Sequence, residues 1–99
     1  MMLVALTRRA ELGLQEGNLD AAQQDAQQAL DLGTKLQGGK PYSWRTGDAS
    51  LVYGRILAKK GDAPRARAAY EAALAHFSNT VDPSHPALQQ LHQLLADQK

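Results

Sequence analysis

Apolar residues recur along the first third of this chain at spacings of three and four, which is the period of an amphipathic helix. The pattern predicts one helix over about residues 3–16 and a second that ends near residue 36. Gly17 can stop the first helix and Asn18 can cap the second. The segment "QGGKPYS" then breaks the pattern with two glycines and a proline, so it is expected to be a loop.

The same period predicts three more helices in the rest of the chain. The third covers about residues 44–60, and Gly61 ends it. Asp62 is expected to cap the fourth, which reaches about residue 78, and Ser84 to cap the fifth, over about 84–97. The residues expected inside the second, third and fifth helices are Ala22, Ala26, Ala29, Leu30, Gly33, Ala49, Val52, Tyr53, Ile56, Leu57, Leu88, Leu91 and Leu95.

The two helical hairpins share an internal pattern. Gly17 and Gly61 are 44 positions apart, and the same offset relates the matched residues Ala22, Ala29 and Leu30 to Ala66, Ala73 and Leu74. Two helix-turn-helix units with one pattern indicate a repeat array. Small residues at the matched positions, with Gly54 in the middle of the third helix, leave room for close helix packing.

These residues make the chain resemble the tetratricopeptide repeat (TPR) family. The second unit carries the pattern most fully, with Gly54 after Tyr53, then Leu57, Gly61, Ala66, Tyr70, Ala73 and Leu74. The 44-residue period exceeds the roughly 34 of the common repeat and is similar to the longer variety in kinesin light chains and many bacterial arrays. "DPSHP" resembles the motif that opens the next repeat there. The resemblance implies an all-α fold of antiparallel helical hairpins stacked as a short solenoid. One domain, 1–99, would hold repeats at about 3–36 and 44–78 and a capping helix at about 84–97.

The family resemblance also implies a function. TPR proteins are scaffolds that bind a peptide or helix of a partner protein in the concave groove lined by the first helix of each pair. Chaperone-binding members clamp a carboxylate with lysine and asparagine, but Thr7 and Glu11 stand at the first two of those positions, so we expect no such clamp. The matching residues expected to bind a partner are Thr7, Glu11, Leu14, Gln15, Asp48, Leu51, Arg55 and Lys59.

Charge narrows the range of partners. The formal net charge is only +1, but residues 37–67 hold seven basic and two acidic residues, or +5. This basic stretch could be a docking site for an acidic protein or peptide. The simpler interpretation is that its charges lie on the surface and are solvated by water. Aromatic residues are not interleaved with the charges, so nucleic acid is not an expected partner. The chain has no cysteine and no stretch long enough for a membrane span, and we expect a cytoplasmic protein.

Other candidate chemistry is weak. His85 and His92 could share one side of the fifth helix, but without a convergent set of ligands we expect no metal. No acid, base and nucleophile converge, and no phosphate loop is present, so we expect neither an enzyme nor a cofactor. Tyr42 and Trp44 could anchor a ligand, although packing over the end of a neighbouring helix is the interpretation we favour.

Self-assembly is the alternative function. The opening "MMLVAL" offers more apolar surface than one buried stripe requires. Met2, Leu3 and Leu6 could therefore form a homodimer contact, or a contact within a longer array. In that case the chain would be a structural module without a peptide ligand of its own.

Overall fold

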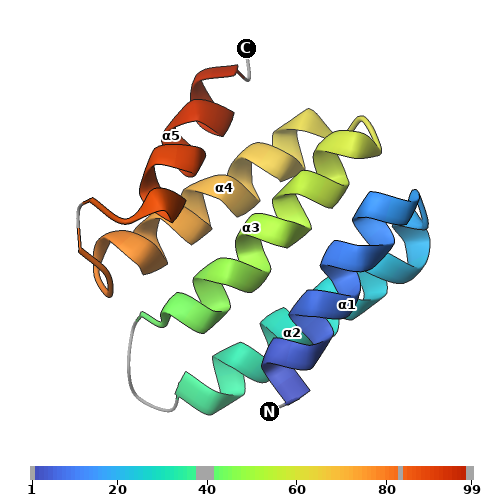
Figure 1. The fold of residues 1–99 in the computed structure, drawn as a ribbon, viewed down its shortest axis with the longest axis horizontal. Helices are drawn as coiled ribbons and strands as arrows, with labels where there is room; N and C mark the ends of the chain where they lie inside the picture. The colour runs from blue at the N-terminus through green and yellow to red at the C-terminus, as the bar shows by residue number, and fades with distance from the viewer. Residues whose placement is uncertain (1, 38–41, 83, 98–99) are drawn as a thin grey trace.

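The computed structural model describes residues 2–37, 42–82 and 84–97, and Figure 1 shows an all-helical fold. The described residues form five helices and no strand, which confirms the predicted fold class at this level. The helices are α1 (Met2–Glu16), α2 (Leu19–Gln37), α3 (Trp44–Lys59), α4 (Ala63–Ser78) and α5 (Pro86–Asp97).

Consecutive helices run in opposite directions and pack against each other (Figure 1). In addition, α1 packs against α3, so α3 lies between the first hairpin and α4. The principal extents are 33 × 31 × 20 Å. Because a helix with its side chains is about 10 Å across, the shortest extent corresponds to two helix layers. In Figure 1, α1, α3 and α5 are nearer the viewer than α2 and α4.

The turns inside the two hairpins are the same structure repeated 44 positions apart. Gly17 and Gly61 have φ values of 81° and 86°, the left-handed region in which glycine avoids a Cβ clash. The N–H groups of the next residues, Asn18 and Asp62, donate to the carbonyl five residues earlier at 2.8 and 2.9 Å. The carbonyls of Asn18 and Asp62 then accept the first bond of the following helix, at 3.0 Å in both turns. The two turns that the sequence matched at an offset of 44 therefore share one hydrogen-bonding pattern.

The start of α5 differs from the prediction. Ser84 does not cap the helix, because its hydroxyl donates to Asp82 Oδ1 at 2.7 Å. Instead His85 stands before the first helical residue and its Nδ1 accepts the Ala87 N–H at 3.1 Å. Pro86 occupies the first helical position, where its missing N–H costs nothing. The cap predicted at Asp62 is correct, since its carboxylate accepts the N–H three residues later at 3.3 Å.

Three hydrophobic clusters form the core, and α3 contributes to all of them. One cluster joins α3, α4 and α5, and two join α1, α2 and α3. The expected inner residues are buried, except for Leu30, Tyr53 and Leu95, which are half-buried. The Tyr53 hydroxyl accepts a hydrogen bond from Arg65 Nη2 at 2.7 Å. Thr46 and Ser50 are also buried. The hydrophobic pattern did not predict this because both side chains are polar.

Gly54 marks a close approach of α3 to α4. A Cβ built on Gly54 would lie 2.6 Å from Tyr70 Cε1 and 3.2 Å from the Ala66 carbonyl oxygen. The Tyr70 side chain is only 1% exposed. At the matched positions of the first hairpin stand two alanines, Ala10 and Ala26, which are both buried. The small residues are thus used as predicted, to let neighbouring helices approach closely.

Candidate functional site

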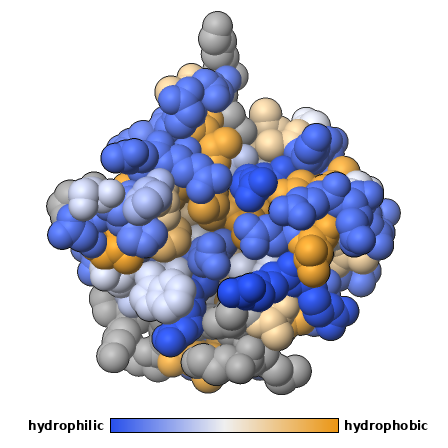
Figure 2. Space-filling model, in the orientation of Figure 1, coloured by the Kyte–Doolittle hydropathy of each residue, from blue (hydrophilic) through white to orange (hydrophobic). Residues whose placement is uncertain are grey.

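One face of α3 carries a stripe of residues spaced by three and four, namely Trp44, Asp48, Leu51, Arg55 and Lys59. This stripe lies between α1 and α5, on the face that the sequence predicted as a groove. Figure 2 shows that face, with polar side chains over most of it and apolar atoms visible between them. Two hollows open along the stripe, and residues from all three helices line them.

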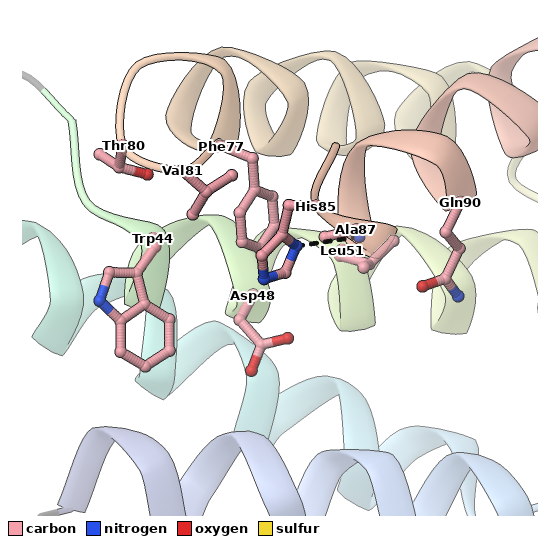
Figure 3. Close-up of a pocket in the computed structure, with 9 residues that line it drawn as sticks. All are labelled: Trp44, Asp48, Leu51, Phe77, Thr80, Val81, His85, Ala87 and Gln90. Carbon is pink, nitrogen blue, oxygen red and sulfur yellow. Dashed lines mark hydrogen bonds between the residues drawn. The ribbon is translucent and has the colours of Figure 1, made fainter. Parts of the chain in front are cut away.

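We call the larger hollow the aromatic pocket. It has a volume of about 610 Å³ and lies between α3, the end of α4 and the start of α5 (Figure 3). Its lining is mostly apolar or aromatic, with one carboxylate. The lining residues are Trp44, Asp48, Leu51, Phe77, Thr80, Val81, His85, Ala87 and Gln90.

Stacked rings and an exposed indole shape the aromatic pocket. Phe77 and His85 stack with ring centroids 6.0 Å apart, and the cap bond to Ala87 fixes the imidazole. Trp44 is 44% exposed and borders the pocket together with Thr80 and Val81, which lie just beyond the end of α4. Tyr42 packs edge-on against His76 of α4, with ring centroids 5.9 Å apart. The Arg45 guanidinium lies 4.8 Å from the centre of the Trp44 ring, a cation–π contact.

Asp48 supplies the single carboxylate of the aromatic pocket. Its side chain extends from α3 toward α1 (Figure 3). Burial raises the pKa of Asp48, and the nearby carboxylate of Glu11 raises it further, while Arg8 acts in the opposite direction. The ion pairs that the structure describes do not include Asp48. Asp48 is thus a half-buried carboxylate that has Arg8 nearby but belongs to none of the ion pairs in the described part of the chain.

We call the second hollow the basic pocket. It measures about 320 Å³ and joins α1, α3 and α5 next to α4. Its lining combines apolar surface with two cations from the stripe on α3. The lining residues are Leu14, Arg55, Ala58, Lys59, Tyr70 and Leu94.

Ion pairs neutralise much of the basic stretch found in the sequence. Arg55 Nη1 lies 3.8 Å from Glu11 Oε1, across the groove. Lys60 Nζ lies 2.8 Å from the Asp20 carboxylate, and Arg65 and Arg67 pair with acidic residues on their own hairpin. Lys59 is exposed and takes part in none of the described ion pairs. The positive charge available to a ligand in the basic pocket is therefore mainly that of Lys59.

The two pockets adjoin. Leu51 lines the aromatic pocket and Arg55 the basic one, and they are one helical turn apart on α3. Gln90 and Leu94 have the same relation on α5. Together the pockets form one groove along α3, which we call the front groove.

The structure brings most of the predicted partner-binding residues into the front groove. Asp48 and Leu51 line the aromatic pocket, and Leu14, Arg55 and Lys59 line the basic pocket. Glu11 reaches the groove through its ion pair with Arg55.

The two remaining predicted residues, Thr7 and Gln15, line neither pocket. Thr7 is buried and Gln15 is exposed. The prediction omitted other residues that line the pockets, namely Trp44, Tyr70, Phe77, Thr80, Val81, His85, Ala87, Gln90 and Leu94.

The residues predicted for self-association lie in α1. Leu6 is only 9% exposed and packs with Ala29 and Ala49, so it already has a role inside the fold. The side chains of Met2 and Leu3 lie outside the described residues. Leu12, on the same helix, is 57% exposed.

Within the described ranges, no three His, Cys, Asp or Glu side chains are grouped so that they could hold a metal ion. No helix in that part of the chain combines the length and apolarity needed to cross a bilayer.

Comparison with protein-family models, curated proteins and solved structures gives no match for this chain.

Proposed function

We propose that this protein is a short TPR-like module that binds a peptide segment of a partner protein in the front groove. The observation that carries the proposal is the pair of adjoining pockets between α1, α3 and α5. A row of concave sites with apolar walls and a few charged groups is what a peptide needs for anchoring several side chains.

Two features of the fold support the TPR-like part of the proposal. The hydrogen-bonded turns at Gly17 and Gly61 repeat with the 44-residue period. In addition, α3 packs against both helices of the first hairpin, which is how stacked repeats bury a continuous core. We expect such a module to act by binding, without catalysis and without a cofactor.

Matched substitutions on two faces test the proposal. Ala58 is exposed in the basic pocket, and Ala75 is exposed on α4 away from both pockets. Ala58→Arg and Ala75→Arg make the same change in size and charge, and arginine is tolerated in helices. The wild-type chain is first screened against a peptide array, and the affinities of the hits are then measured for both variants. Loss of binding in Ala58→Arg alone supports the front groove. Equal binding by both variants, or no hit at all, would refute it.

Self-assembly remains the second candidate function, because Leu12 leaves an apolar side chain exposed on α1. Light scattering of the wild-type chain and of Leu12→Gln distinguishes the two functions. A stable oligomer that binds no peptide and is dissociated by Leu12→Gln would favour the structural role. A monomer that binds peptides would exclude it.

A further inference from the structure

The two ends of the front groove carry opposite charge. Asp48 stands at the aromatic end and Lys59 at the basic end, while Glu11 and Arg55 neutralise each other between them at 3.8 Å. Asp48 and Lys59 lie 11 positions apart, which is just over three full turns, so both face the same side of α3. Among the side chains that line the two pockets, a ligand lying along α3 therefore meets the Asp48 carboxylate first and the Lys59 ammonium group last. Arg8, which offsets part of the Asp48 charge, lines neither pocket.

We propose that the groove selects an extended peptide with a lysine or arginine and a glutamate or aspartate four positions apart. This inference rests on the proposed function and specifies the chemistry of its ligand. The cationic side chain enters the aromatic pocket and the acidic one enters the basic pocket.

The aromatic pocket suits a long cationic side chain better than an anionic or a purely apolar one. The methylene stem of lysine or arginine can pack on Trp44, Leu51 and Val81. Its charged head can then reach Asp48, the only carboxylate among the lining residues, while the Gln90 side chain offers an amide oxygen. An anion in this pocket would face the Asp48 carboxylate, and an apolar side chain would leave that half-buried carboxylate without a direct ion pair.

The basic pocket suits a carboxylate. Lys59 and Arg55 are its charged residues, and only Arg55 has an acidic partner among the described ion pairs. Leu14, Ala58 and Leu94 provide the apolar surroundings. This apolar surface lowers the local dielectric around a bound ion pair and so strengthens it.

Helix geometry sets the spacing of the two charges in the ligand. Eleven residues of α3 extend about 16 Å at roughly 1.5 Å per residue. An extended peptide advances about 3.3 Å per residue and presents every second side chain to the same side. Four positions cover about 13 Å on one side, and the flexible Lys59 side chain can close the remainder. A spacing of five would direct the two charges to opposite sides.

The test uses fluorescein-labelled, end-blocked peptides with identical alanine and leucine interiors. They carry Lys and Glu four positions apart, Lys and Glu five apart, two Lys, two Glu or two Gln, and their affinities are measured by fluorescence anisotropy. We expect the first to bind most tightly, by roughly three- to tenfold per matched charge, since a partly buried ion pair exceeds the usual surface value. Adding salt should reduce the preference.

Single charge reversals provide the decisive comparison. Asp48→Lys makes both ends positive and should favour the peptide with two Glu, whereas Lys59→Glu makes both ends negative and should favour the peptide with two Lys. Asp48→Asn serves if Asp48→Lys does not fold, and it should remove only the preference for a cation at that end. Unfolding by circular dichroism checks that each variant is intact.

Each outcome bears on a different statement. If the wild type binds these peptides without regard to charge, or if the reversals leave the ranking unchanged, the inference about charge is wrong and the binding function stands. If neither these peptides nor the array hits bind at all, the proposed function fails together with the inference.

Discussion

Replacing Gly54 with alanine sets two effects of known size against each other. Alanine is favoured over glycine inside a helix by about 1 kcal/mol, so propensity alone predicts a more stable protein. The new Cβ, however, would lie 2.6 and 2.7 Å from two carbons of the Tyr70 ring and 3.2 Å from the Ala66 carbonyl oxygen. Overpacking of a core usually costs about 1–3 kcal/mol.

The overpacking effect should be the larger one. The Tyr70 ring is only 1% exposed and belongs to the cluster that joins α3, α4 and α5, and the Ala66 oxygen is part of the α4 backbone. Neither can move aside cheaply, so we expect the upper part of that range and a net loss of about 1–2 kcal/mol. For a domain of this size, each kcal/mol lowers Tm by roughly 4–8 °C.

Urea and thermal unfolding followed by circular dichroism measure the change. Ala68→Gly, at an exposed position of α4, reports the propensity effect alone. In a Tyr70→Leu background the ring is absent, and Gly54→Ala should then be neutral or stabilising, which gives a coupling energy between the two positions. If Gly54→Ala instead stabilises the wild-type chain by about 1 kcal/mol, the contact between α3 and α4 is looser than described.

Two further predictions concern the turns and pH. Gly17→Ala and Gly61→Ala should each lower the free energy of unfolding by about 1–2 kcal/mol, because both glycines have positive φ. A Cβ at either position would meet no other atom within 4 Å, so backbone strain is the whole cost. Costs that differ by more than about 1 kcal/mol would contradict the equivalence of the two turns. Burial lowers the pKa of His76 below 6.5, and its Nδ1 accepts the Ser43 N–H at 3.0 Å. The unfolded chain thus binds the proton more readily, so stability should be complete above pH 6.5 and decrease as the pH falls from 6.5 toward the folded-state pKa. Chemical unfolding at a series of pH values should show this decrease for wild type and His92→Gln and lose it in His76→Gln; a decrease that persists in His76→Gln would assign it to another group.

Local signals accounted for what the sequence predicted well. Each turn depends on a glycine and the residue directly after it, Gly17 with Asn18 and Gly61 with Asp62. The signal for each turn is therefore contained in two adjacent positions. The cap of α5 was missed although the signal was present, since Pro86 favours the first helical position and so places the cap at His85. Local sequence can therefore identify a helix boundary only when the rival signals are weighed together.

The aromatic pocket could not be predicted from local sequence patterns, because residues far apart in the chain form it. Trp44 borders it with Phe77, Val81 and His85, which follow 33 to 41 positions later in the chain. The family resemblance selected groove residues on α1 and α3, but it did not indicate which α4 and α5 residues would complete the pockets. The ion pair of Arg55 with Glu11 was hidden for the same reason, because it joins two helices.

The position of α5 at the edge of the molecule links ligand binding to hydrogen exchange. This helix packs mainly on α4 (Figure 1), yet its residues Gln90 and Leu94 complete the aromatic and basic pockets. A helix held on one side opens locally at lower free energy than the central α3, so its amides should exchange with solvent first. Every such opening removes a wall of both pockets. A ligand that needs those walls must therefore slow amide exchange in α5, and a substitution that leaves α5 open for an appreciable fraction of the time lowers the apparent affinity in proportion to that fraction.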